Sequence, residues 1–306
     1  MRRLISFVIL LLPFLLAGTG YCENTIAENE LKKRVDSLFV LANGGLEKYR
    51  DQAQPAESTL VAMGEKAVPY LLEKLTTQDA RDMWTLIRVF GKIGKPTVVP
   101  LIGRLDSENK DEVKLAIRCL GEVKDNQAVL PLIGLLNNKE YNIRSLSCES
   151  LGKIEDSTSF EDLSFCMQDS VEVVRKSSAV ALGKIKDARA IPYLMRGLSD
   201  PHYSVRMSSA NSLVEIGEPT IKPLLSLLNS SSDNPLYLVI EVLGRLKDKQ
   251  AVLPLVTKLK DRDWATRAFS VEALGAIGDP RGIQAVMELK KKETHPFVLG
   301  RIEKIQ

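Results

Sequence analysis

The segment from Arg175 to Asp187 reads RKSSAVALGKIKD, and its features recur along the chain. Its Leu182-Gly183 pair has counterparts at intervals of 30 or 31 residues, with Leu213-Val214 filling one position without glycine. A fixed period in this range is typical of solenoids built from stacked helix pairs. The pairs are Phe90-Gly91, Leu120-Gly121, Leu151-Gly152, Leu182-Gly183, Leu243-Gly244 and Leu274-Gly275, and Leu60-Val61 extends the register backwards. The sequence therefore predicts about eight repeated units.

Each unit carries signals for the starts of two helices. A second set of residues lies four positions after the second residue of each pair. Its members are Glu65, Lys95, Asp125, Asp156, Asp187, Glu218, Asp248 and Asp279. Acidic side chains suit a helix start because they complement its exposed backbone N–H groups. A first turn also tolerates proline, and six units have one: Pro69, Pro100, Pro131, Pro192, Pro223 and Pro254. The predicted N-caps of the second helices are Thr77, Ser107, Asn138, Asp169, Asp200, Ser230 and Asp261.

Two further residue types recur at a fixed position in successive repeats, and each recurrence needs a structural explanation. Glycine costs about 1 kcal/mol relative to alanine in a helix interior, so the six glycines need a cause. Close approach of the neighbouring unit is the simplest one. An arginine column lies eight residues earlier, at Arg144, Arg175, Arg206 and Arg267. We expect these arginines to pair with the cap aspartates of neighbouring loops rather than with a ligand, because a stack repeats its own inter-unit contacts.

These residues resemble the HEAT-like repeat associated with phycobilin lyases. That repeat has an Arg-bearing second helix followed by Ala-Leu-Gly-x-Ile and an Asp, and Arg175 to Asp187 matches it best. The resemblance covers about residues 58–300. It implies an all-α, right-handed α-solenoid of about eight two-helix repeats, and it says little about activity because one fold serves many functions.

The N-terminus has the layout of a secretory signal peptide over residues 1–22. Arg2 and Arg3 precede an uncharged stretch, whose apolar core from Leu4 to Ala17 is short against the roughly 20 residues of a spanning helix and contains Pro13. We therefore expect an exported protein, either periplasmic or secreted. The alternative is an uncleaved segment that anchors the protein to the inner membrane.

Residues 23–57 are predicted to form an amphipathic leader that closes the open end of the stack. Leu31, Val35, Leu38 and Leu41 recur there at helical spacing, and solenoid ends need such a cap. Residues 58–306 form the predicted solenoid, which ends in a polar C-terminal cap. The chain has 42 Lys and Arg against 39 Asp and Glu. This balance does not favour a nucleic-acid partner.

The sequence contains few residues that could carry out catalysis. The two histidines, His202 and His295, lie in different units, and neither is followed by glutamate. HEAT-repeat hydroxylases that hold iron need repeated His-Glu pairs, so we expect no metal and no cofactor. Cys119, Cys148 and Cys166 lack Cys-x-x-Cys spacing. Buried apolar packing and a disulfide between the first two both stay open for these cysteines.

The second helices of a solenoid of this type line one concave face. The positions projected onto it include Ser145 and Ala268, and its candidate partner-binding residues are Trp84, Arg88, Lys92, Lys114, Arg118, Lys176, Val180, Met207 and Tyr237. The basic cluster in the first units favours an acidic protein partner. We therefore expect a non-catalytic scaffold or adaptor of the cell envelope. The alternatives are a lyase-like or accessory enzyme and a binder of envelope polysaccharide, with membrane contact only if the N-terminal segment is retained.

Overall fold

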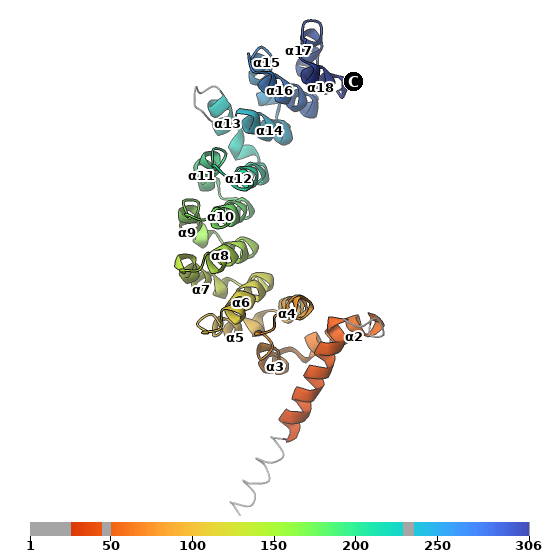
Figure 1. Ribbon diagram of the computed structural model, residues 1–306, viewed down its shortest axis with the longest axis vertical. Helices are drawn as coiled ribbons and strands as arrows, with labels where there is room; N and C mark the ends of the chain where they lie inside the picture. The colour runs from red at the N-terminus through yellow and green to blue at the C-terminus, as the bar shows by residue number, and fades with distance from the viewer. Residues whose placement is uncertain (1–25, 45–49, 229–235, 306) are drawn as a thin grey trace, which may run out of the picture. The chain divides into compact units, whose positions relative to one another are not determined.

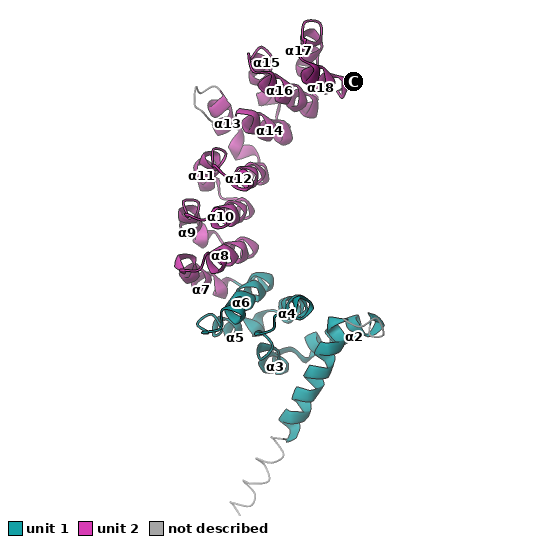
Figure 2. Cartoon of the chain, viewed as in Figure 1, with its two compact units in different colours: residues 1–125 teal, residues 126–306 magenta. Residues whose placement is uncertain are grey.

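The computed structural model describes residues 26–44, 50–228 and 236–305, which are helical with connecting turns (Figure 1). The chain divides into two units, residues 1–125 and 126–306 (Figure 2). The predicted signal peptide lies outside the described residues. Within the described ranges, no helix combines the length and apolar character needed to cross a membrane.

From α3 to α16, both units repeat a short first helix followed by a longer second helix. Unit 1 contains a helix over residues 26–43 and then α2 (Arg50–Met63), α3 (Val68–Leu72), α4 (Ala80–Ile93), α5 (Val98–Ile102) and α6 (Lys110–Val123). Unit 2 contains α7 (Val129–Gly134), α8 (Tyr141–Ile154), α9 (Phe160–Cys166), α10 (Glu172–Ile185), α11 (Ile191–Gly197), α12 (Tyr203–Ile216), α13 (Ile221–Leu228), α14 (Leu236–Leu246), α15 (Val252–Lys258), α16 (Trp264–Ile277), α17 (Pro280–Lys290) and α18 (Pro296–Glu303).

The second helices from α2 to α16 are each followed by a residue with a positive φ. Gly94 and Gly217 have φ of 75° and 82° with ψ near −138°, a combination open to glycine because it has no Cβ. The other positive-φ residues that follow second helices are Gly64, Lys124, Glu155, Lys186, Lys247 and Gly278. Most first helices are then preceded by a 3₁₀ turn, for example Ser157–Ser159 before α9.

The glycine column marks the contact between successive second helices. A Cβ at Gly152 would lie 2.7 Å from the Cα of Ala181, and one at Gly244 would lie 2.7 Å from the Cα of Ala273. A Cβ at Gly91 in unit 1 would likewise lie 2.7 Å from the Cγ of Glu122. Neighbouring helices therefore approach so closely at these positions that a side chain does not fit.

The predicted N-caps of the second helices are wrong by two residues. Asp169 accepts a hydrogen bond from the backbone N–H of Val171 at 2.8 Å, and Asp200 accepts one from His202 at 2.8 Å. Val171 and His202 are the N-caps of α10 and α12. The same shift holds for Thr77, Ser107, Asn138 and Asp261, while Ser230 lies outside the described residues. These predicted caps instead shape the turn before each second helix, because a short polar side chain can accept a hydrogen bond from the backbone N–H two residues later.

The acidic column caps the first helices in several units. The side chains of Asp156, Asp187 and Asp248 accept from the backbone N–H two residues later, at the start of a 3₁₀ turn. Asp279 caps α17 in the same way. Glu218 differs, since it follows Gly217 and lies inside its 3₁₀ turn.

The helix over residues 26–43 packs against the first described repeat of unit 1. Its buried stripe is Val35, Phe39 and Ala42, so the predicted stripe shares Val35 and misses the other two. The Nζ of Lys32 lies 2.5 Å from Glu73. Leu31, Leu38 and Leu41 are half-buried at the edge of this stripe.

Candidate partner-binding surface

In unit 1, α4 and α6 lie side by side and present a row of predicted binding residues to solvent. Trp84, Arg88 and Lys92 share one face of α4 because residues four apart on a helix are neighbours. Lys114 and Arg118 take the same positions 30 residues later on α6. Trp84 is 58% exposed. We call these five residues the unit 1 surface.

Glu57 on α2 engages two of these cations at once. The Nη2 of Arg88 lies 2.9 Å from one carboxylate oxygen of Glu57, and the Nζ of Lys92 lies 2.7 Å from the other. Burial opposes the ionisation of Glu57, but hydrogen bonds from Lys92 and Arg88 outweigh it and lower the pKa of the carboxyl group. The sequence analysis missed Glu57, because nothing in its local pattern links it to α4.

The remaining groups of the unit 1 surface are less engaged. Lys114 pairs with Asp111 at 3.1 Å within α6. Arg118 is exposed and forms no salt bridge within the described part of the chain. Trp84 and Arg118 are therefore the side chains of this surface that have the most freedom to meet a partner.

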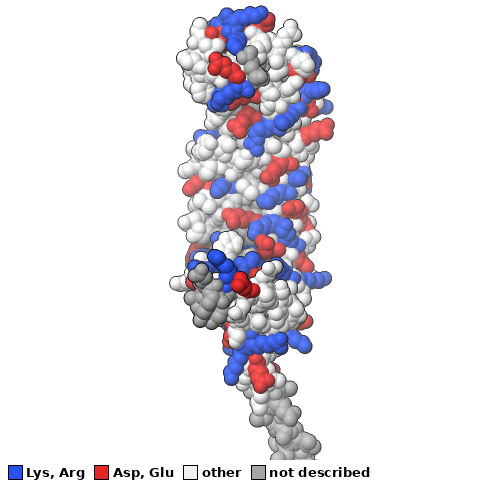
Figure 3. Space-filling model, turned by 90° about the vertical axis from the view of Figure 1, so that its right-hand side faces the viewer, with Lys and Arg blue, Asp and Glu red and all other residues white. Residues whose placement is uncertain are grey.

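The candidate residues of unit 2 lie in a more mixed setting. Lys176 is exposed, whereas Val180, Met207 and Tyr237 are half-buried. The ring of Tyr237 packs on that of Phe269, with centroids 5.4 Å apart. In unit 2, Figure 3 shows basic and acidic side chains interleaved on the face of the second helices.

Two residues that the sequence analysis projected onto the concave face are buried, so that prediction was wrong for them. Ser145 is 4% exposed and its hydroxyl lies 2.9 Å from that of Ser177, and Ala268 is 1% exposed. Both side chains are small and lie against a neighbouring helix rather than facing solvent. Other polar groups of the second helices also form inter-helix contacts, since Ser177 donates to Glu149 at 3.1 Å and Arg245 donates to Asn211 at 2.8 Å.

The arginine column forms a ladder along one edge of unit 2. Arg144 donates two hydrogen bonds to Asp169, at 2.7 and 2.8 Å, and a third to the carbonyl of Asn138 at 2.8 Å. Arg175 repeats this with Asp200, at 2.7 and 3.0 Å, and with the carbonyl of Asp169. Each arginine thus joins its own loop to the next one.

At the C-terminal end of the ladder, the arginine pairs with a glutamate instead of an aspartate. Arg267 donates to Glu293 at 2.7 and 2.9 Å, and these bonds lower the pKa of Glu293 to about 2. Arg206 donates to the carbonyls of Asp200 and Pro201. Arg144, Arg175 and Arg267 each bind a carboxylate and a loop carbonyl, so they have little capacity left for a ligand, whereas Arg206 binds loop carbonyls.

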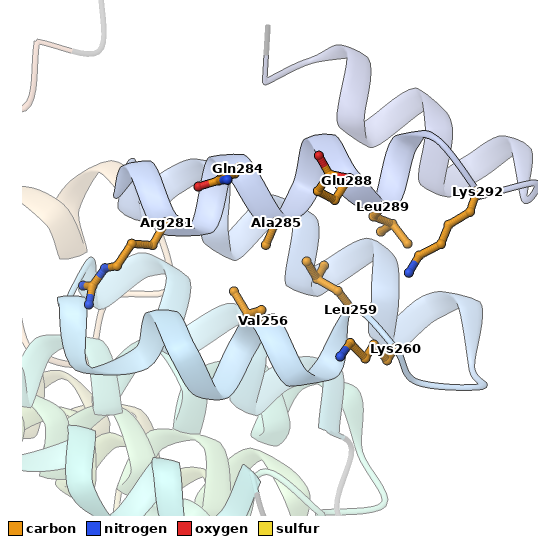
Figure 4. Close-up of a pocket in the computed structure, with 9 residues that line it drawn as sticks. All are labelled: Val256, Leu259, Lys260, Arg281, Gln284, Ala285, Glu288, Leu289 and Lys292. Carbon is orange, nitrogen blue, oxygen red and sulfur yellow. The ribbon is translucent and has the colours of Figure 1, made fainter.

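A shallow groove separates the first helices α15 and α17 (Figure 4). The cavity measures about 320 Å³ and its lining is apolar at the base and polar at the rim: Val256, Leu259, Lys260, Arg281, Gln284, Ala285, Glu288, Leu289 and Lys292. Arg281 pairs with Asp279, and Glu288 pairs with Lys291.

The two histidines occupy separate and ordinary positions. His202 is exposed at the N-cap of α12. His295 stacks on the indole of Trp264, with ring centroids 4.6 Å apart. Among the described residues, no three His, Cys, Asp or Glu side chains gather in a way that could hold a metal ion.

The family model for HEAT repeats matches residues 98–183, 166–236 and 221–304. The chain belongs to the HEAT-repeat family. The predicted all-α repeat fold and the predicted HEAT-like family are therefore confirmed for this HEAT-repeat protein. No curated protein sequence matches the chain.

Several solved structures resemble this HEAT-repeat protein. YibA of E. coli is 20% identical, with 81% of this chain and 96% of that chain covered and a TM-score of 0.50. Kap95p, from a structure of its binding to RanGDP, is 12% identical over 89% of this chain and 44% of its own, with a TM-score of 0.55. The CpcE and CpcF complex of phycocyanin lyase from Nostoc sp. PCC7120 is 19% identical, with coverages of 78% and 94% and a TM-score of 0.43. For YibA and Kap95p, the likeness shows the fold alone.

Proposed function

We propose that this HEAT-repeat protein is a non-catalytic adaptor of the cell envelope that binds an acidic protein partner on the unit 1 surface. The observation that carries the proposal is an exposed tryptophan, Trp84, beside cations on two adjacent helices. Tryptophan and arginine are the side chains that most often dominate the energy of protein interfaces. Kap95p, which has a similar fold, binds the protein Ran.

The ion pairs within the unit 1 surface indicate which of its residues should contribute most to partner binding. Glu57 offsets part of the charge of Arg88 and Lys92 and holds both side chains in place. Arg118, in contrast, offers its full charge to an incoming carboxylate. We therefore expect Trp84 and Arg118 to contribute most of the binding energy.

The experiment is affinity capture from the native cell envelope with the tagged protein, followed by direct binding of the captured partner. Trp84→Ala and Arg118→Glu should each weaken binding at least tenfold, and wild-type affinity should fall as salt rises, because exposed charges are screened. Lys222→Glu is the matched charge control, since Lys222 is exposed on the first helix α13 in unit 2. It should leave the affinity unchanged.

Two results would redirect the proposal. A partner that binds both unit 1 variants as tightly as wild type would remove the unit 1 surface from the function. Enrichment of polysaccharide, or turnover of a captured small molecule, would instead favour the binder of envelope polysaccharide or the lyase-like or accessory enzyme.

A further inference from the structure

The contact between α8 and α9 contains two thiols that the proposed partner binding does not use. Cys148 lies on α8 and is 0% exposed, and Cys166 ends α9 and is 4% exposed. Both are free thiols. Their side chains are hydrogen-bonded to each other. This bond, together with the bonds between Arg144 and Asp169 on the same two segments, places the two thiols against each other.

The arginine ladder sets the register that brings the thiols together. Arg144 lies one helical turn before Cys148, and Asp169 lies three residues after Cys166. The paired bonds of 2.7 and 2.8 Å between Arg144 and Asp169 therefore hold both helices next to the thiols. A two-bond clamp of this kind has one defined geometry.

The ladder does not itself require cysteine at these positions. One repeat later, Arg175 clamps Asp200 in the same way. The residues that correspond to the two thiols there, 31 positions on, are Ala179 and Gly197. The thiol pair is therefore an addition to one inter-repeat contact, and alanine is accommodated at the position of the first cysteine.

Access differs between the two sulfur atoms. Cys166 lines an open cavity of about 330 Å³, together with Arg144, Phe165 and Asp169. Cys148 is not part of that lining. The hydrogen bond from Cys148 lowers the pKa of the Cys166 thiol against the opposing effect of burial, while the same bond and burial raise the pKa of Cys148. A reagent in the cavity thus meets the more acidic thiol first, and the thiolate is the reactive form.

We propose that Cys148 and Cys166 form an intramolecular disulfide when the protein meets a small-molecule or protein disulfide. The Cys166 thiolate attacks one sulfur of the oxidant, so a mixed disulfide forms and one thiolate leaves. The Cys148 thiolate then attacks the Cys166 sulfur, and the second oxidant thiolate leaves. The two cysteines lose two electrons and two protons, and the oxidant disulfide becomes two thiols. The product ties α8 to α9 across successive repeats.

The test uses the full chain carrying Cys22→Ser and Cys119→Ala, so that only the two thiols in question remain. The folded protein is treated with oxidised glutathione and analysed by intact mass and peptide mapping. We expect the loss of two hydrogens and one peptide that links Cys148 to Cys166, and dithiothreitol should reverse both. Mapping of the oxidised wild-type chain should find the same link, which guards against any effect of the background substitutions on folding.

Two single variants separate the steps. With Cys148→Ala, Cys166 should retain a glutathione adduct because no second thiol resolves it. With Cys166→Ala, Cys148 should stay unmodified because it is buried away from the cavity. The proposal is overturned if both thiols remain free after oxidation of the folded chain, or if the glutathione adduct on Cys166 persists while Cys148 is present.

Discussion

At the residue scale, the guanidinium groups of the ladder hold successive loops together. Arg175 donates to both carboxylate oxygens of Asp200 and to the carbonyl of Asp169. Its side chain is 12% exposed and that of Asp200 is 10% exposed. Removing one partner of such a shielded pair leaves the other charge unpaired, which is more damaging than losing an exposed pair.

Arg175→Met should therefore reduce the free energy of unfolding by about 3 kcal/mol, since Asp200 and a loop carbonyl lose their donor together. Urea titration at neutral pH measures the change. Lys291→Met is the control, because Lys291 and Glu288 are 69% and 61% exposed, and it should change stability by less than about 1 kcal/mol. Equal losses in the two variants would contradict the assigned role of the ladder.

A second residue-scale effect concerns the helix C-termini. Lys186 follows α10 with φ of 56° and ψ of 28°, a left-handed geometry that is unfavourable for a residue with a Cβ. Lys186→Gly should stabilise the protein by about 1 kcal/mol in thermal or urea unfolding. Lys184→Gly, two residues earlier and inside α10, should destabilise it by a similar amount. Effects of the same sign at both positions would argue against this explanation.

At the element scale, the repeat depends on second helices that touch through their backbones. A Cβ at Gly183 would lie 2.8 Å from the Cα of Ser212, where no flexible group can move aside. Ser212 also donates to the carbonyl of Ala179 at 2.8 Å, so it is held in place. Helix packing here is set by the absence of one methyl group.

Gly183→Ala should reduce stability by about 2 kcal/mol, because the clash exceeds the gain in helix propensity. Gly134→Ala is the matched control at the end of α7, where an added Cβ meets nothing within 4 Å. It should be neutral or slightly stabilising. Calorimetric unfolding of both variants distinguishes them, and a Gly183→Ala protein as stable as wild type would remove close packing as the cause of the glycine column.

The stability contributed by the contact between α16 and the turn before α18 should depend on pH. The pKa of Glu293 is lowered from 4.5 to about 2 by the hydrogen bonds from Arg267. A carboxyl group with a lowered pKa in the folded state stabilises the protein above its ordinary pKa, and this contribution is lost as pH falls from about 4.5 to about 2.

Glu293→Gln should therefore be less stable than wild type at pH 7, and the difference should shrink below about pH 4.5. Urea unfolding of both proteins from pH 7 to pH 3 provides the comparison. Taking the difference between the two proteins removes the contributions of other carboxylates. A difference that stays constant over this range would contradict the role of the Arg267 pair.

At the scale of the whole molecule, unit 1 carries the candidate binding surface and unit 2 carries the arginine ladder and the thiol pair. Export would bring the thiols into a compartment where disulfides persist. The proposed export makes a direct prediction. The protein recovered from the cell envelope should lack residues 1–22, as read by N-terminal sequencing or intact mass. A full-length chain in the membrane fraction would instead support the anchored alternative.

The sequence alone was sufficient to determine the repeat period, the two-helix unit and the family. Those features are encoded locally, because glycine, proline and short polar residues act on the backbone within a few residues of their own position. Helical spacing also predicted that Trp84, Arg88 and Arg118 are exposed, and the structure confirms this exposure. The local signals located the second-helix caps two residues early, since a turn and an N-cap use the same residue types.

Only the tertiary structure decided which partners these residues meet. The binding of Arg88 and Lys92 to Glu57, the burial of Ser145, and the pairing of Cys148 with Cys166 depend on how one helix lies against the next. Helical periodicity identifies a face, but it does not specify the neighbour at that face or the distance between their atoms. The charge of a surface and the reactivity of a thiol are set by those distances.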